Sequence, residues 1–466
     1  MIQQYTTHSP LCSWREVGKY TLVVDHVNKK LITLTDVAGL IWRITQSWAH
    51  IDELVNAVVI KYNIDKNTAY LDIYNFLNDL LKYELLISSS NNNKHLSRRE
   101  TLQTYSDFKE GIPVEVRQYC QKNIIPLVAY LELTQNCNLN CAHCYNAHPP
   151  GEMLSLDEIK SIMDQLVELG SLDLVITGGE PLTSKHFVDV LHYAKKLNFC
   201  ITVKTNAILV NDYILREMLK AFVVEVQVSL YSMIDKEHEA ITQTPGSLKK
   251  TISGIKKMLD SGLSVSLSCP VTKLNYRSLN LVNDFANDLG IHVGFDPIIT
   301  PKVDGTKGPT YLRLEKIEWD YLLKNNFISE VMYPSVNNIS DHGMRGKTTE
   351  SSVHEPFCGA GSTSIAINCV GDVVPCVVFP KFMGNIRENT IKNIWKNNKE
   401  WDSIRNFKKN DFLLCNTCEK QNRCLRCPAV SLSESGKLHE PLPIFCMAAE
   451  YYSVNNKINK MEALKR

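Results

Sequence analysis

The chain has 466 residues, of which 44% are hydrophobic and 22% charged. This is the composition of an ordinary globular protein, and the length suits about three domains at roughly 150 residues each. The 51 Lys and Arg residues nearly balance the 50 Asp and Glu residues, so the formal net charge of +1 excludes a global field that attracts nucleic acid or an anionic membrane. The N-terminal MIQQYTTHSP lacks signal-peptide character, and no apolar run reaches the roughly 18 residues of a membrane span. We therefore expect a soluble, cytoplasmic protein.

The N-terminal pattern predicts a small winged-helix domain, to which we assign residues 1–88. In GKYTLVVDHVNKKLITLT, alternating apolar residues flank Asn28-Lys29-Lys30, which we expect to join two strands. Three helices with apolar faces follow. Their expected start signals are Thr35-Asp36, Asp52 and Asp65.

A polar and charged run, SSSNNNKHLSRRE, opens residues 89–125. Such a run cannot bury itself, so we expect a linker here.

Residues 126–330 alternate between strand and helix patterns. A capping box at Ser155 and Glu158 begins the first helix, and Gly170 ends it. Six strand–helix repeats predict an α/β fold, with a parallel sheet bent into a partial TIM-like barrel, and place its chemistry at the carboxyl ends of the strands. The strand candidates are LVAYLELT, LDLVIT, FCITVKT, VEVQVSL, LSVSLSC and HVGFD.

Fifteen cysteines are unusual in a long chain without an export signal, and clustered thiols in such a chain favour metal over disulfides. NCNLNCAHCY follows the first strand and brings Cys137, Cys141 and Cys144 into a Cys-x3-Cys-x2-Cys triplet. Thiolates suit iron–sulfur clusters and zinc, but structural zinc normally takes four ligands. His143 would be strained as the fourth, because it stands between two of the ligands.

Three further signals fall at the ends of the next strands. TGGEP places Gly178, Gly179 and Glu180 after the second strand, and glycine allows close backbone approach. KTNA and VSLYS end the third and fourth strands, and their candidate residues are Thr205, Asn206 and Ser229. Read singly, the glycines could form a plain turn, and Thr205 and Asn206 could cap one.

The region 331–466 is turn-rich and contains a second field of cysteines, so we expect metal to supply part of its order. Twelve residues separate Cys358 from Gly371, and Cys376 stands five residues beyond that glycine. Two structural zinc knots are the alternative to iron–sulfur clusters here. The remaining members form Cys415-x2-Cys418-x5-Cys424-x2-Cys427, followed by Cys446. We expect the scattered Cys12, Cys120, Cys200 and Cys269 to be buried apolar thiols.

The triplet and the strand-end motifs together resemble the radical S-adenosylmethionine (SAM) family. The resemblance implies a [4Fe–4S] cluster on Cys137, Cys141 and Cys144 whose open iron binds SAM, and one-electron cleavage of SAM to a deoxyadenosyl radical. It implies that Glu180 accepts a bond from the methionyl ammonium. Ala207 departs from the family's Gly, and Tyr231 and Thr242 fall where relatives often have Asp and Arg. The residues implied for the cofactor are His143, Gly178, Gly179, Glu180, Thr205, Asn206 and Ser229.

The C-terminal cysteines resemble the SPASM extension, although the last spacing of the quartet is two residues rather than three. The resemblance implies two auxiliary clusters of the [4Fe–4S] type. Cys369 is an extra thiol, which either completes the nearer cluster or is a buried strand residue beside an open iron; we favour the second. The implied ligands are Cys358, Cys376 and Cys427 for the nearer cluster, and Cys415, Cys418, Cys424 and Cys446 for the distal one.

The N-terminal pattern, with TDVAGLIW around Trp42, resembles the peptide-recognition element of ribosomal-peptide maturases, itself similar to the small peptide chaperone of pyrroloquinoline quinone biosynthesis. The C-terminal sequence segments CGAG, SIAI, VPC, FPK and GNI resemble segments of sactionine-type maturases such as that of subtilosin. Those enzymes link cysteine sulfur to an α-carbon. These resemblances imply a precursor peptide bound by its leader at residues 1–88, and a flavodoxin- or ferredoxin-type reductant. The alternatives are β- or γ-carbon thioethers, carbon–carbon crosslinks, a sulfatase-maturing type of enzyme, and a zinc-stabilised peptide-binding scaffold.

Overall fold

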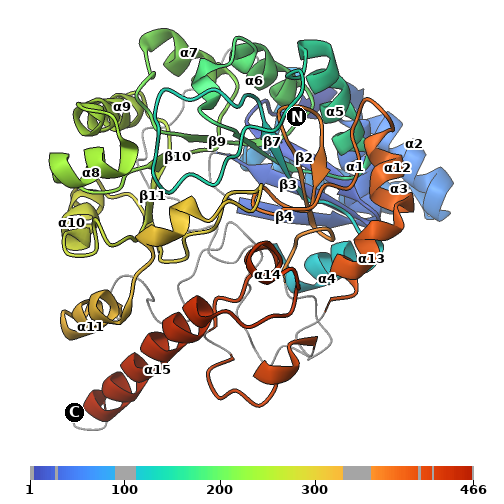
Figure 1. The fold of residues 1–466 in the computed structure, drawn as a ribbon. Helices are drawn as coiled ribbons and strands as arrows, with labels where there is room; N and C mark the ends of the chain where they lie inside the picture. The colour runs from blue at the N-terminus through green and yellow to red at the C-terminus, as the bar shows by residue number, and fades with distance from the viewer. Residues whose placement is uncertain are drawn as a thin grey trace.

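A computed structural model describes residues 5–26, 30–89, 112–328, 358–407, 411–421 and 424–463 of the chain. A helix-wrapped barrel of parallel strands forms its centre, with a small N-terminal domain beside it and the long C-terminal helix extending from it (Figure 1).

The N-terminal domain contains two three-stranded antiparallel sheets, in the orders β5-β1-β6 and β2-β3-β4. Trp42 is fully buried and packs in one cluster with Leu54, Val55 and Leu77 from the next two helices. The elements are β1 (Tyr5–His8), β2 (Cys12–Val17), β3 (Tyr20–Asp25), β4 (Lys30–Thr35), α1 (Asp36–Ile44), β5 (Ala49–His50), α2 (Ile51–Tyr62), α3 (Lys66–Lys82) and β6 (Leu86–Ser88).

The predicted hairpin is the pair β3 and β4, which align from Tyr20 opposite Thr35 to Asp25 opposite Lys30. Of its expected joint, Asn28 and Lys29 lie outside the described residues.

Two of the three predicted helix starts are confirmed. Thr35 precedes α1, and the Asp65 carboxylate accepts a bond from the Thr68 backbone N–H at the start of α3. The prediction for Asp52 is wrong, because the cap of α2 is His50, whose ring accepts a bond from the Asp52 N–H. Strands β1 and β2 were not predicted.

A helix, α4 (Val114–Asn123), occupies the second part of the expected linker, while residues 90–111 lie outside the described residues. Val116 and Cys120 stand one helical turn apart and are both buried. They pack between Leu22 of β3 and Leu127, which immediately precedes the barrel. This helix therefore joins the N-terminal domain to the barrel rather than spacing them apart.

All six predicted barrel strands are present and pair in parallel in chain order, from β7 to β12. The predicted capping box at Ser155 and Glu158 is formed, and the left-handed Gly170 (φ +92°) follows that helix. The elements are β7 (Val128–Glu132), α5 (Leu156–Glu168), β8 (Asp173–Thr177), α6 (Phe187–Lys196), β9 (Cys200–Thr205), α7 (Asp212–Lys220), β10 (Glu225–Ser229), α8 (Asp235–Thr242), α9 (Ser247–Asp260), β11 (Val265–Pro270), α10 (Leu279–Asp288) and β12 (Val293–Asp296), followed by α11 (Lys316–Lys324).

The C-terminal region adds two strands to the same sheet. β13 (Ser364–Ile367) pairs in parallel with β7, and β14 (Val373–Val374) pairs with β13 in antiparallel fashion. These additions were not predicted, because a four-residue apolar run carries little periodic signal. The helices that follow are α12 (Ile391–Asn397), α13 (Asp402–Arg405), α14 (Pro428–Ser435) and α15 (Pro443–Ala463).

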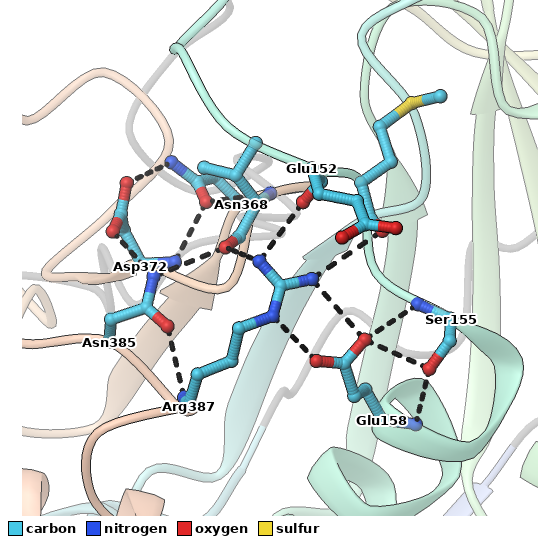
Figure 2. A network of polar contacts seen from close by, with 9 residues as sticks. Glu152, Ser155, Glu158, Asn368, Asp372, Asn385 and Arg387 are labelled. Carbon is cyan, nitrogen blue, oxygen red and sulfur yellow. Dashed lines mark hydrogen bonds and ion pairs between the residues drawn. The ribbon is translucent and has the colours of Figure 1, made fainter.

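Arg387 fastens the C-terminal region to the start of α5 (Figure 2). Its Nε donates to Glu158 Oε1 over 2.6 Å, and its Nη1 donates to the backbone carbonyl oxygens of Glu152 and Val370. Asn385 adds a bond to the Val370 carbonyl from the C-terminal side. The guanidinium lowers the pKa of Glu158 to about 2. One arginine thus links the capping box of a barrel helix to the first turns after β13.

None of the helices in the described ranges has the length and apolar character that crossing a membrane requires.

Candidate active site

The loop after β7 carries Cys137, Cys141 and Cys144, and backbone bonds to distant segments hold it. On either side of Cys141, the Asn140 and Ala142 N–H groups donate to the carbonyl oxygens of Thr242 and Ile241 over 3.2 and 2.8 Å. Those carbonyls belong to the end of α8. The loop is therefore positioned by the barrel, and Cys137 is exposed while Cys141 and Cys144 are partly buried.

Gly178 and Gly179 bring the loop after β8 against this cysteine loop. A Cβ on Gly179 would stand 2.3 Å from the Asn136 carbonyl oxygen, and one on Gly178 would stand 2.5 Å from that of Thr134. Gly178 also has φ +132°, a conformation that side chains disfavour. The glycines thus permit a close backbone approach, and the approaching backbone is that of the segment leading into Cys137.

Glu180 is 1% exposed and joins the ends of β8 and β9. Its Oε1 accepts bonds from the Thr205 hydroxyl (2.7 Å) and the Leu182 N–H (3.1 Å), and its Oε2 accepts one from the Asn206 N–H (2.7 Å). Burial raises the pKa of Glu180 to about 7, although the three hydrogen bonds lower it in part. A carboxylate offers about four acceptor positions, so one remains on Oε2.

Asn206 connects the end of β9 to the cysteine loop, because its amide donates to the Asn138 side-chain oxygen over 2.8 Å. Thr205 accepts a bond from the Ala207 N–H, as a turn cap does. Ala207 has φ +63°, in the left-handed region that glycine adopts without strain. The departure from the family's Gly therefore keeps the turn but strains it.

Ser229, the last residue of β10, forms a side-chain hydrogen bond with Tyr231. The Tyr231 hydroxyl lies 3.8 Å from the Cys141 sulfur, and its ring meets the His143 ring edge-on at 4.8 Å. Burial lowers the pKa of His143 to about 4, so the ring is neutral near pH 7. Its Nδ1 is buried and has no hydrogen-bond partner among the described residues.

The three thiols of this loop influence one another electrostatically. Burial, with smaller contributions from Cys144 and Cys137, raises the pKa of Cys141 to about 12. Burial likewise raises the pKa of Cys137 and of Cys144. Because the pKa values of these neighbouring thiols are raised, they stay protonated near neutral pH. A bound metal cation would stabilise their thiolate forms.

The C-terminal thiols fall into two further electrostatic sets. Burial, followed by Cys427 and Cys358, raises the pKa of Cys376. Burial, with smaller contributions from Cys446 and Cys415, raises the pKa of Cys424 to about 11. Burial, followed by Cys415 and Cys418, raises the pKa of Cys446. A pocket lined by Cys358, Phe379 and Pro428, among others, lies beside the first set.

Cys369 stands apart from these sets. It is 1% exposed, and the charges that raise its pKa, after burial, are those of Glu132 and Asp372. Its carbonyl oxygen accepts a backbone bond from Leu154 in the loop before α5. These contacts are those of a buried structural residue. The four scattered thiols, Cys12, Cys120, Cys200 and Cys269, are buried as predicted.

Within the described ranges, no three or more His, Cys, Asp or Glu side chains are arranged closely enough to hold a metal ion. The residues nevertheless fit iron–sulfur clusters by their donor chemistry. Soft thiols are grouped by three, three and four, and the buried Nδ1 of His143 beside the first group lacks a partner in the described residues.

Two charged side chains inside the barrel were missed by the sequence reasoning. Glu132 ends β7, and burial raises its pKa to about 7. Lys204 is on β9, where burial lowers its pKa, and its ammonium lies 5.6 Å from the Tyr130 ring centroid. Tyr130 and Glu132 alternate along β7 with the buried Ala129 and Leu131. A charge inside a strand pattern, as in LELT or VKT, was the signal that could have found them.

Three family descriptions match separate segments of the chain. Residues 131–284 match the Radical SAM superfamily, 358–427 match the SPASM iron-sulfur cluster-binding domain, and 21–86 match coenzyme PQQ synthesis protein D (PqqD).

Similar proteins include an AdoMet-dependent heme synthase of Methanosarcina barkeri. It is 27% identical in an alignment that covers 69% of this chain and 96% of that protein. The subtilosin biosynthesis protein AlbA of Bacillus subtilis is 28% identical over 58% of this chain and 60% of its own length. Among solved structures, Streptococcus suis SuiB bound to its precursor peptide SuiA aligns with a TM-score of 0.60 at 17% identity, over 94% of this chain and 99% of that one. The structure of anSMEcpe with bound AdoMet and a peptide aligns with a TM-score of 0.55 at 19% identity, over 72% and 99%.

Proposed function

We propose that this chain, a radical SAM/SPASM enzyme with an N-terminal PqqD-like recognition element, matures a ribosomally synthesised peptide by forming cysteine thioether crosslinks to α-carbons. The observation that carries the proposal is the combination in one chain of the Cys137–Cys144 loop at the barrel's strand ends with a PqqD-like domain packed beside that barrel.

Cys137, Cys141 and Cys144 would hold a [4Fe–4S] cluster as three thiolates. When bound, that group supplies the electron that cleaves SAM to the hydrogen-abstracting deoxyadenosyl radical. The α8 carbonyls that bind the loop on both sides of Cys141 would fix the thiolates in place. His143 would contribute a neutral ring wall beside the cofactor.

The SAM contacts would come from the strand ends. The free acceptor position of Glu180 would receive the methionyl ammonium, while its other bonds hold the turn at Thr205 and Asn206. Ser229 and the backbone at Gly178 and Gly179 would complete the site. Glu132 and Lys204 supply charged groups in the barrel interior for orienting substrate.

The auxiliary clusters would follow the electrostatic sets of the C-terminal thiols. Cys358, Cys376 and Cys427 would hold the nearer cluster, and Cys415, Cys418, Cys424 and Cys446 the distal one. The separation of Cys369 from these sets supports an open iron at the nearer cluster. A thiolate of the substrate peptide is a chemically suitable ligand there, which is why we favour a thioether product.

Leader binding is proposed for the edge of the β2-β3-β4 sheet. Among the described strands, β4 pairs only with β3, so its other edge is available for an added strand. Main-chain bonds would provide affinity, and tethering would present the core peptide to the barrel at an effective concentration on the order of millimolar. The solved complex of SuiB with its precursor peptide SuiA supports binding of a precursor peptide by this chain.

The rival products are β- or γ-carbon thioethers and carbon–carbon crosslinks, made by the same radical step. A sulfatase-maturing type of enzyme is less well supported, because that type usually lacks an N-terminal peptide-binding domain, and residues 21–86 of this chain match PqqD.

The test uses the full chain, reconstituted anaerobically with iron and sulfide. It is incubated with SAM, a reductant and a short Cys-containing peptide encoded beside the gene. We expect deoxyadenosine and a peptide that has lost one pair of hydrogens per crosslink, with tandem mass spectra placing the link at an α-carbon. A protein that binds zinc and no iron would contradict the proposal, and a link at a β- or γ-carbon would select the first rival.

Leader binding is tested separately with the same peptide carrying N-methyl groups on alternate residues of its leader. These groups remove backbone donors and leave the side chains unchanged. If the leader adds as a strand, one of the two N-methyl registers should lose at least tenfold in affinity; equal affinity for both registers would contradict strand addition.

A further inference from the structure

The side chain of Tyr231 is a buried group that the proposed chemistry leaves unused. It stands two residues beyond the end of β10 and is 5% exposed. A buried phenol needs a hydrogen-bond partner, and the sulfur of Cys141 lies 3.8 Å from its hydroxyl.

The direction of this hydrogen bond follows from the chemistry of its two ends. A phenol ionises only near pH 10, so Tyr231 keeps its proton at neutral pH. A thiolate that ligates metal has no proton to give. The Tyr231 O–H is therefore the donor and the Cys141 sulfur the acceptor whenever Cys141 is a ligand.

Two further contacts aim the hydroxyl. Ser229 forms a side-chain hydrogen bond with Tyr231, and because the phenol proton points at Cys141, the Ser229 hydroxyl is the donor. On the other side, the Tyr231 N–H donates to the His238 Nδ1 over 3.4 Å, with the rings 5.3 Å apart. His238 belongs to α8.

The same helix holds the thiol end of the contact. The carbonyls of Ile241 and Thr242 accept the N–H groups on both sides of Cys141, and the Asn140 side chain donates to Gln243. Helix α8 thus holds the Tyr231 backbone and ring through His238, and it holds the Cys141 sulfur through the loop. The contact is built into the fold rather than left to one rotamer.

We infer that Tyr231 is a positioning residue that donates a hydrogen bond to the Cys141 thiolate and thereby raises the reduction potential of the cluster on that loop. Hydrogen bonds to the sulfurs stabilise the more negative, reduced state of an iron–sulfur cluster. The inference rests on the proposed function, because it requires Cys141 to be a cluster ligand.

The test compares anaerobically reconstituted full-length wild type with Tyr231→Phe, which removes only the hydroxyl. Tyr276→Phe is the control, because the Tyr276 hydroxyl bonds Arg277 instead. The midpoint potential is followed by the EPR signal that changes when SAM is added, which singles out the cluster with the open iron. Iron and sulfide content is measured in parallel.

We expect Tyr231→Phe to keep the iron and sulfide content and to shift this midpoint potential to a more negative value, with Tyr276→Phe unchanged. Ser229→Ala should shift it the same way by less, because the phenol loses its polarising partner. Equal potentials in wild type and Tyr231→Phe would overturn the inference. If Tyr231→Phe lost its cluster, an unshifted Ser229→Ala would overturn it as well.

A wild-type protein without a SAM-responsive signal would instead refute the proposed function. A shift in Tyr276→Phe equal to that in Tyr231→Phe would show a general effect of removing a tyrosine hydroxyl, which also overturns the inference.

Discussion

The cysteine loop of the barrel and the distal cysteine quartet are held in opposite ways. The bonds that flank Cys141 reach Ile241 and Thr242, about a hundred positions along the chain. In the distal region the backbone bonds are short-range turns, as from Cys415 to Phe412 and from Cys418 to Cys415. Leu413 and Leu414, beside the quartet, are 77% and 78% exposed, so little apolar burial stabilises that segment.

A metal centre can therefore bind to a region that is already folded, as at the barrel loop, or can itself stabilise the folded state of its region, as at the distal quartet. The first loop lies over the largest hydrophobic core, which includes Leu131, Ile176 and Val203. That core should fold without iron. The backbone at Cys415 and Cys418 is held by local turns, so ligation there supplies order directly.

The largest effect should come from replacing Cys137, Cys141 and Cys144 together with Ala. SAM cleavage should disappear, because no other thiols serve that site, while far-UV circular dichroism and the melting temperature change little. Deoxyadenosine is measured by chromatography. Production of deoxyadenosine at the wild-type rate would contradict the assignment, and unfolding would contradict the claim that the barrel holds the loop.

Replacing Cys415, Cys418, Cys424 and Cys446 with Ala should reduce the local order of the distal region and leave SAM cleavage intact. Iron should fall by on the order of four atoms, and hydrogen exchange should rise across residues 411–446, while SAM cleavage without peptide continues. Exchange is read by mass spectrometry of peptic fragments, with residues 187–203 as the internal control. Unchanged protection would show that the turns alone order this region.

Glu180→Ala tests the carboxylate that connects the ends of β8 and β9 in the barrel. A charged hydrogen bond contributes about 1.5–3 kcal/mol, so SAM affinity should fall by roughly 10- to 150-fold. Loss of the bonds to Thr205 and Asn206 should also lower the free energy of unfolding. Equilibrium binding of SAM and chemical denaturation measure the two effects. An affinity change below about threefold would leave Glu180 as a purely structural tie.

Cys369→Ala separates ligands from buried thiols in the segment between the two regions. We expect an unchanged iron count and a loss of stability of about 1 kcal/mol, as for trimming a small buried side chain. Iron analysis and thermal melts measure both. A loss on the order of four irons would make Cys369 a ligand.

The smallest effect concerns the Arg387–Glu158 ion pair, which connects the C-terminal region to helix α5 of the barrel. The folded pKa of Glu158, about 2, lies below its ordinary 4.5, so its ion pair with Arg387 stabilises the protein above that pH and is lost as the pH falls toward 2. Both side chains are partly exposed, so the ion pair contributes about 1 kcal/mol.

Arg387→Ala should therefore lower the melting temperature most near neutral pH, and the gap from wild type should narrow as the pH falls from 6 to 3. The difference between the two proteins cancels the effect of acid on clusters that both contain. Arg43→Ala, which removes the partly exposed ion pair with Glu16, is the control. A gap that stays constant over this range would contradict the ion-pair account.

The six barrel strands, the capping box at Ser155 and the start of α3 at Asp65 could be predicted because each is written in a short stretch of sequence. Periodicity and caps depend on neighbours within about one or two turns. The cap of α2 was misassigned to Asp52, since a histidine ring accepting a backbone bond has no common sequence signature. Strands β13 and β14 were missed because their runs are too short to show a period.

The residue types that carry the chemistry are readable in the linear chain: cysteines at ligand spacings, and Gly178, Gly179 and Glu180 at a strand end. Which of these residues meet follows from the folded arrangement of the strands and loops. It placed Glu180 against Asn206 and Tyr231 against Cys141, and it put β13 beside β7. These pairs lie 26 to 236 positions apart and depend on sheet register and on the direction of each side chain, which local patterns do not encode.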